Sequence, residues 1–246
     1  MPVILSRSIF RERALVSKFE DHCWQDLVDP KALQIYAAYE RITYVGKRPA
    51  LLAIDLYKLA FQGGAKPVNE IIDSYPSSCG ENAWNAVPHL QNLFTACRNA
   101  GIPVIYSTTE SRKDANVAAA YATNRQKVER SDEVWEIQEE FSPEPGDLMV
   151  YKQRASAFYG TPLIAQLNQM DVDSVIVCGE STSGCVRATV LDAYSNGIHV
   201  TLAEEGCFDR YMDTHKMNLF DMHHKYADVM HVEEIVDELN RRHNQE

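Results

Sequence analysis

The amino-acid sequence predicts an α/β protein in which three layers, α/β/α, are built around a mostly parallel central sheet. From residue 49 onward, short apolar runs alternate with longer segments whose apolar residues recur at helical spacing. Strands that alternate with helices of about 10–15 residues are typical of right-handed crossovers and parallel pairing. The chain has 246 residues, 45% of them hydrophobic and 24% charged. This composition is enough for one sizeable folded domain.

Six strands are expected in this part of the chain. Residues 50–55 and 174–179 are nearly continuous apolar runs, as in strands that are buried on both faces. The other four predicted strands cover residues 102–107, 147–151, 198–203 and 229–232.

Helices are expected between these strands. Residues 85–100 place Val87, Leu90 and Leu93 on one face, and Gly101 follows as a helix-ending residue. The further predicted helices cover residues 163–169, 184–196, 213–226 and 233–242.

Residues 1–45 differ from the rest and are expected to form a helical arm, which leaves 46–246 as the main domain. The arm interleaves charged residues with large apolar ones, and Asp29-Pro30 is typical of a helix start. Residues 62–81 are polar and punctuated by glycine and proline, which indicates a long loop in which Cys79 is expected to be exposed. Residues 110–145 are irregular and charged, and indicate a lid or an interface insertion of unknown role.

Charge and composition exclude several classes of function. The formal net charge is −11, which disfavours nucleic acid and anionic membranes as partners because both attract positive surfaces. The sequence contains no run of 18 apolar residues, and the first residues, interrupted by Arg7, Arg11 and Arg13, do not resemble an export signal. The six cysteines form no C-x-x-C pair. We therefore expect free thiols, a cytoplasmic location and no metal site.

Three reactive side chains fall at the carboxyl ends of predicted parallel strands. Asp55 ends the first strand, Lys152 follows the third, and Cys185 comes shortly after the strand at 174–179. Because the carboxyl ends of parallel strands meet at one edge of a sheet, the three are expected to converge. A carboxylate can take the proton of a thiol, while a lysine and a helix N-terminus favour the thiolate. Each residue also has an ordinary structural role, so this pattern alone leaves catalysis and structure about equally favoured.

The motifs around these residues resemble those of the isochorismatase-like cysteine hydrolases. Residues 51–56 match the family's aspartate motif, residues 152–163 its lysine motif (K-x-x-x-S-A-F-x-G-T-x-L), and residues 177–189 its nucleophile motif. The resemblance covers about residues 45–235 and keeps the family's order and spacing. It implies the isochorismatase-like fold for the main domain.

The resemblance also implies roles for the residues. Cys185 would attack an amide or ureido carbonyl, Asp55 would serve as general base and then as proton donor, and Lys152 would orient the pair. The backbone N–H groups of Ser181 and Cys185 would form the oxyanion hole, beside a cis peptide between Glu180 and Ser181. Ammonia would leave first, and water would then hydrolyse the thioester without any cofactor.

Within the family, the sequence is most similar to the N-carbamoylsarcosine amidases. Cys185 argues against the vinyl-ether cleavage of isochorismatases proper, which lack this cysteine. Residues 56–90 contain only His89, so the metal motif of nicotinamidases is not expected. Arg210 matches the position that binds a substrate carboxylate, a group that arginine can hold through two hydrogen bonds. Biuret, maleamate and ureidoacrylate hydrolases remain alternatives.

Two other classes of function remain as alternatives. The chain could be a catalytically silent binding protein on the same fold, although all three reactive residues are present. A dinucleotide-binding domain is disfavoured because no G-x-G-x-x-G follows a predicted strand. The resemblance and the apolar surface of the arm predict a homodimer or homotetramer that acts on a small molecule.

Overall fold

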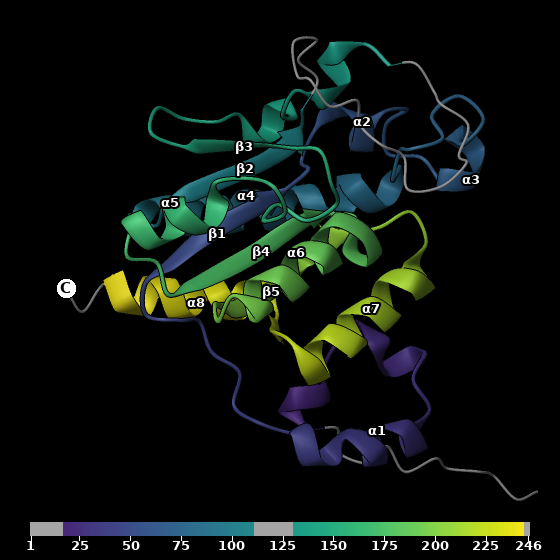
Figure 1. Ribbon diagram of the computed structural model, residues 1–246. Helices are drawn as coiled ribbons and strands as arrows, with labels where there is room; N and C mark the ends of the chain where they lie inside the picture. Colours follow the sequence, from purple (N-terminus) through teal and green to yellow (C-terminus); the bar gives the residue numbers. More distant parts are fainter. Residues whose placement is uncertain (1–16, 111–129, 244–246) are drawn as a thin grey trace, which may run out of the picture.

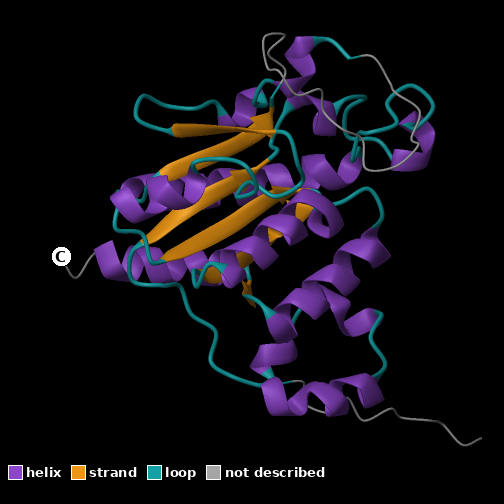
Figure 2. Ribbon diagram, viewed as in Figure 1, coloured by secondary structure: helices purple, strands orange, loops and turns teal. Residues whose placement is uncertain are grey.

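The computed structural model describes residues 17–110 and 130–243 and shows six parallel strands between two layers of helices (Figures 1 and 2). The predictions for residues 1–16 and 111–129 lie outside these ranges. The strand order is β3-β2-β1-β4-β5-β6, with every neighbouring pair parallel. The predicted three-layer α/β/α architecture is therefore confirmed.

The strands and helices are close to those expected. The strands are β1 Pro49–Ile54, β2 Val104–Thr109, β3 Leu148–Lys152, β4 Ser174–Glu180, β5 His199–Phe208 and β6 Asp228–Met230. The helices are α1 Pro30–Tyr36, α2 Lys58–Phe61, α3 Val68–Ile71, α4 Glu81–Asn99, α5 Leu163–Gln169, α6 Arg187–Ser195, α7 Met212–Lys225 and α8 Val232–His243. A π-helical turn, Thr182–Val186, precedes α6.

Alternate residues of the central strand β1 supply the two halves of the core. Leu51 and Ala53 pack with α4 and α8 on one face of the sheet. Leu52 and Ile54 pack with α5, α6 and α7 on the other face (Figure 1). Successive side chains of a strand point to opposite faces, so an unbroken apolar run is what a strand covered on both sides requires.

Strand β5 is longer than expected and irregular. The prediction ended this strand at residue 203, but it continues to Phe208. Val177 of β4 pairs with Leu202, and Gly179 pairs with Cys207, so β5 advances five residues while β4 advances two. The polar residues Glu204 and Glu205, which follow the predicted end of the strand, therefore lie in a bulge within it.

The described part of the arm packs against the main domain. Trp24 is fully buried and belongs to the same core cluster as α6 and α7. Arg41 donates hydrogen bonds to the Asp228 carboxylate and to the carbonyl oxygens of His223 and Ala227. The segment before α1 lies beside α7 (Figure 1). The boundary at residue 45 stays a prediction.

The loop at residues 62–81 contains a short helix, α3, and one prediction within it is wrong. Cys79 is fully buried rather than exposed. Its backbone N–H donates to Ala60 O, and Ser78 donates to Ala60 O and Gln62 O. These bonds hold the end of the loop against α2. The polar composition of the loop was therefore not sufficient to predict whether Cys79 is exposed.

Within the described residues, no helix is long and apolar enough to cross a membrane.

Gly179 is required where β4 passes closest to β1. Its φ is +111°, and an added Cβ would lie 1.9 Å from Ile54 O. Gly179→Ala is expected to lower the unfolding free energy by about 2–6 kcal/mol, from about 1–3 for backbone strain and about 1–3 for steric overlap. Gly101 also has a positive φ, +65°, but nothing lies within 4 Å of its added Cβ.

Urea unfolding of the two alanine variants checks this prediction. Gly101→Ala incurs the backbone strain without the overlap, so it is expected to be the milder change. Equal losses in the two variants would mean that the close approach to Ile54 does not matter.

Candidate active site

The strand order brings two of the predicted residues to the middle of the sheet and the third to its edge. Asp55 follows β1, and Cys185 lies in the turn after the adjacent strand β4. The chain leaves β1 toward β2 on one side, while β4 lies on the other, so a crevice is expected at their carboxyl ends. Lys152 ends β3, which is separated from β1 by β2. Its long side chain therefore crosses the end of β2 to reach the other two residues.

Asp55 is fully buried and held in an unusual backbone conformation. Its φ is +51°, a left-handed value that aspartate tolerates better than most residues. Ser107 Oγ donates to Asp55 Oδ1 at 2.8 Å, and the Asp55 N–H donates to Ser107 O at 3.2 Å. Oδ2 instead faces the Lys152 ammonium group in an ion pair, and it has no other hydrogen bond from the described residues.

Lys152 contacts both other members of the set. Its side chain is 4% exposed, and its Nζ forms an ion pair with Asp55 Oδ2 at 2.8 Å. Nζ also lies 3.5 Å from Cys185 Sγ and 3.3 Å from Arg154 O. Burial lowers the pKa of Lys152, but Asp55 and Cys185 raise it, and the net pKa is above the usual value. Lys152 is thus a cation beside both reactive groups.

The surroundings of Cys185 favour the thiol over the thiolate. Burial raises the pKa of Cys185 well above its ordinary value, Asp55 raises it further, and Lys152 lowers it only in part. The helix start predicted at residue 184 is a π-helical turn, and α6 begins at Arg187. Since the thiol keeps its proton, attack on a carbonyl requires a base beside it.

The loop before Cys185 is held by Asp209, which directly follows β5, and by His215 of α7. The Glu180–Ser181 peptide is cis, as the resemblance implied. Asp209 Oδ2 accepts hydrogen bonds from Ser183 N at 2.9 Å and from Ser183 Oγ at 2.6 Å. Thr182 donates to Phe208 O and accepts from His215 Nδ1 at 2.7 Å. These bonds orient the backbone around Cys185.

His215 donates this hydrogen bond as a neutral imidazole. Burial lowers the pKa of His215 to about 4. The Thr182 hydroxyl proton already points to Phe208 O, which makes Nδ1 the protonated nitrogen of the imidazole.

Glu180 is a buried acid at this site that the sequence interpretation missed. Tyr57 donates a hydrogen bond to its Oε1 at 3.0 Å, and the Cys79 thiol approaches Oε2 at 3.8 Å. Burial, followed by the charge of Asp55, raises the pKa of Glu180 to about 7. A glutamate at the end of an otherwise apolar strand was the only signal in the sequence. Ser107, which positions Asp55, had no recognisable signal.

The raised pKa of Glu180 implies that the unfolding free energy of the protein depends on pH. The folded protein holds this proton up to a pKa of about 7, whereas the ordinary value is 4.5. The proton on Glu180 therefore contributes fully to the unfolding free energy below pH 4.5. This contribution of about 3 kcal/mol is lost as the pH rises from 4.5 through 7, at about 1.4 kcal/mol per pH unit. Glu180→Gln stays uncharged, so its unfolding free energy relative to wild type is expected to increase across this window.

Urea titrations at pH 5 and pH 8 measure that difference. Glu133→Gln, at an exposed position, serves as the control and is expected to follow wild type at both values. A Glu180→Gln curve parallel to wild type would show that Glu180 is ionised throughout.

Arg210 lies on the surface, next to Asp209. Its backbone N–H donates to Asp209 Oδ1, and its guanidinium lies 3.4 Å from Pro76 O. Among the described residues, no carboxylate lies within ion-pair distance of the guanidinium, so the alternative of a salt bridge to Asp209 or Glu205 is not observed. The guanidinium keeps donors free for a ligand.

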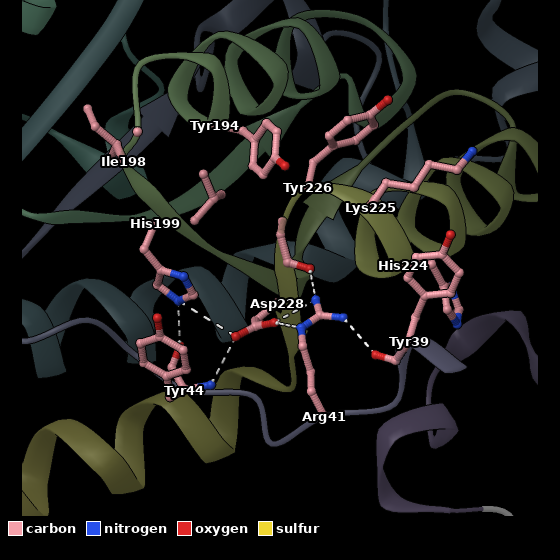
Figure 3. Close-up of a pocket in the computed structure, with 13 residues that line it drawn as sticks. Tyr39, Arg41, Tyr44, Tyr194, Ile198, His199, His224, Lys225, Tyr226 and Asp228 are labelled. Carbon is pink, nitrogen blue, oxygen red and sulfur yellow. Dashed lines mark hydrogen bonds and ion pairs between the residues drawn. The ribbon is translucent and has the colours of Figure 1, made fainter. Parts of the chain in front are cut away.

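A separate pocket of about 750 Å³ lies at the other end of the sheet, where β5 and β6 begin (Figure 3). His199 and Asp228 line it together with tyrosines of the arm and of α6. Arg41 points into this pocket, but its donors bond to Asp228 and to backbone carbonyl groups (Figure 3). We assign no chemistry to this pocket, which contains none of the predicted catalytic residues.

Comparisons with known proteins agree with the geometry. A family model described as the isochorismatase domain matches residues 49–234. The chain is 32% identical over 207 residues to N-carbamoylsarcosine amidase from Arthrobacter sp., covering 81% of this chain and 74% of that protein. It is 30% identical over 198 residues to maleamate amidohydrolase from Pseudomonas putida, covering 79% and 88%.

Solved structures share the fold. A cysteine hydrolase from Pseudomonas syringae pv. phaseolicola superposes with a TM-score of 0.71 at 21% identity, covering 82% of this chain and 98% of that one. An N-carbamoylsarcosine amidase from Thermoplasma acidophilum superposes with a TM-score of 0.56 at 23% identity, covering 76% and 97%.

Proposed function

Because the chain belongs to the isochorismatase family of hydrolases, we propose that it is a cysteine-dependent amidohydrolase. Its substrate would be a small linear amide or N-carbamoyl compound. The observation that carries the proposal is the contact of Lys152 with both Asp55 Oδ2, at 2.8 Å, and Cys185 Sγ, at 3.5 Å. A buried base, a cation and a thiol in contact are the components that acyl transfer through a thioester requires.

The proposed reaction has two steps. In the first, Asp55 Oδ2 takes the Cys185 proton, the sulfur attacks the carbonyl carbon, and the C–N bond breaks as Asp55 returns the proton to the departing ammonia. In the second, Asp55 takes a proton from water, the hydroxide attacks the thioester, and the proton returns to the sulfur. Backbone N–H groups of Ser181 and Cys185 would stabilise the oxyanion in both steps.

Lys152 would keep its charge throughout this cycle. It would hold Asp55 in place and stabilise the thiolate as that forms, which agrees with its raised pKa. No metal or cofactor takes part in this scheme.

Release of ammonia from a panel of amides tests the proposal. The panel contains N-carbamoylsarcosine, other N-carbamoyl amino acids, biuret, maleamate, ureidoacrylate and nicotinamide, each with wild type and Cys185→Ala. We expect release that depends on Cys185 from at least one carboxylated compound. Release that survives in Cys185→Ala would contradict the mechanism. Silence, together with a Cys185 thiol no more reactive than the other five cysteines, would favour a binding protein.

Arg210 is proposed to bind the carboxylate of such a substrate. The two relatives named above act, by their names, on compounds that carry a carboxylate. Arg210→Gln is expected to raise KM about tenfold or more for carboxylated substrates, since a charge-assisted hydrogen bond contributes about 1.5–3 kcal/mol. Biuret, which has no carboxylate, is expected to show little change.

Arg48→Gln is the matched control for that measurement. Arg48 is an exposed arginine that precedes β1 and pairs with Asp171 and Asp173. An equal loss for biuret and for the carboxylated substrates in Arg210→Gln would indicate a general effect on the loop instead of carboxylate binding.

Location and assembly are also proposals. The six cysteines are all free, which supports the cytoplasm. Ile35 and Ile42 of the arm are 75% and 90% exposed, and such apolar groups support a homodimer or homotetramer. Light scattering of the full chain would measure the mass of the assembly.

A further inference from the structure

Two histidines and two glutamates from distant parts of the chain meet where the arm contacts the sheet. His22 comes from the arm, Glu204 and Glu205 from the bulge in β5, and His231 from the residue after β6. One ligand atom each of His22, Glu204 and His231 lies within 4.8 Å of the others. Zinc prefers imidazole nitrogen and carboxylate oxygen as well as thiolate sulfur. We propose that His22, Glu204 and His231 form a zinc site that ties the arm to the sheet.

The Nδ1 atoms of both imidazole rings face one carboxylate oxygen, Glu204 Oε2. His22 Nδ1 lies 2.5 Å from Glu204 Oε2, and His231 Nδ1 lies 3.8 Å from it. The two rings stack with centroids 5.1 Å apart. Zinc bonds of about 2.0–2.2 Å place tetrahedral ligand atoms roughly 3.3 Å apart, so small side-chain movements bring the three atoms around one ion.

The atoms that face away from this point are held by backbone groups. His231 Nε2 donates to Asp21 O at 2.7 Å, so Nδ1, which now pairs with Glu205, would be the atom that binds the ion. Glu204 Oε1 accepts from Cys23 N at 2.7 Å, and Glu205 Oε2 accepts from Val232 N at 2.8 Å. Outer contacts of this kind orient the ligands of known metal sites. Glu205 Oε1, 2.6 Å from His231 Nδ1, is placed to supply the fourth ligand.

The bulge in β5 explains how adjacent glutamates serve one site. In a regular strand, neighbouring side chains point to opposite faces. Here Glu204 and Glu205 both approach His231 Nδ1, at 3.8 and 2.6 Å. Bulges re-aim side chains in this way and are frequent beside functional sites. His22 and Glu204 are buried, while the His231 side chain is 34% exposed and offers a path for the ion.

Zinc titration of the chelator-treated full-length protein tests the proposal. Isothermal calorimetry with ZnCl₂ is expected to show one tight site per chain in wild type. His231→Gln can keep a hydrogen bond to Glu205 but loses the imidazole, so its affinity is expected to fall at least about tenfold, the lower end of losses caused even by outer contacts. His199→Gln, which replaces another partly buried histidine beside a carboxylate, is expected to bind zinc like wild type.

A second measurement does not depend on the folding of His231→Gln. Wild type loaded with CoCl₂ is expected to show the visible bands of a tetrahedral ion without the charge-transfer band that a thiolate ligand produces. That band would place the ion on a cysteine and overturn the proposal. The absence of zinc binding, or equal binding by wild type and His231→Gln, would also overturn it, and the four residues would then be two histidine–glutamate ion pairs.

Discussion

Turnover of the Asp55→Asn variant is expected to be about 10²–10⁴-fold below wild type, the usual contribution of a general base. Asparagine tolerates the left-handed backbone at φ +51° and can still accept from Ser107. The change removes the proton acceptor, Oδ2, together with the negative charge that faces Lys152 Nζ at 2.8 Å. The rate of ammonia release measures the effect with any substrate that the panel identifies.

Alkylation of Cys185 by iodoacetamide gives a readout that needs no substrate. In Asp55→Asn, the negative charge that raises the Cys185 pKa is gone while Lys152 remains, so alkylation is expected to be at least as fast as in wild type although turnover falls. Asp171→Asn is a matched control, because Asp171 has a similar φ of +56° but lies on the surface. Wild-type turnover in Asp55→Asn would rule out Asp55 as the base, and alkylation slower than in wild type would show that Asp55 does not raise the Cys185 pKa.

The double variant Asp55→Asn/Cys185→Ala separates cooperation from independent effects. Residues that act in one reaction step are strongly non-additive. Once Cys185 is absent, removing Asp55 is expected to cost little further activity. A double variant much slower than Cys185→Ala alone would mean that Asp55 contributes to another process.

Lys152→Met is expected to lower the unfolding free energy by about 3–5 kcal/mol, because it leaves the Asp55 carboxylate buried without its cation. The side chains of Lys152 and Asp55 are 4% and 0% exposed, and water cannot replace the missing charge. The double variant Asp55→Asn/Lys152→Met contains neither charge and is expected to recover most of this loss. Both variants should be inactive in ammonia release.

Urea unfolding of wild type, the two single variants and the double variant completes this cycle. Lys58→Met is the control, since Lys58 pairs with Glu136 at the same 2.8 Å but on the surface. Exposed pairs contribute little to stability, so this variant should unfold like wild type. A stable Lys152→Met would show that the Asp55 carboxyl does not need a buried cation.

Much of the architecture could be predicted because it depends on local pattern. The apolar run at residues 50–55 and the helical stripe at 85–100 appear in the structure as β1 and α4. Asp55, Lys152 and Cys185 could be singled out because the carboxyl ends of parallel strands share one edge of a sheet. Their catalytic roles are still predictions.

Other features depend on which segments meet in space. Burial, together with the nearby charge of Asp55, raises the pKa of Cys185 above its ordinary value and that of Glu180 to about 7. The spacing of residues in the sequence does not predict how deeply these groups are buried, because segments far away in the chain cover them. The exposed position predicted for Cys79 was wrong for the same reason.

Short-range periodicity in the amino-acid sequence was therefore enough to predict the succession of strands and helices along the chain and to single out the three strand-end residues. Packing over long range decided the protonation of the site, the role of Ser107 and the meeting of His22 with Glu204, which are 182 positions apart. The physical reason is that the side-chain periods of 2 residues in strands and 3.6 in helices are local, whereas desolvation and ion pairing depend on which surfaces the folded chain brings together.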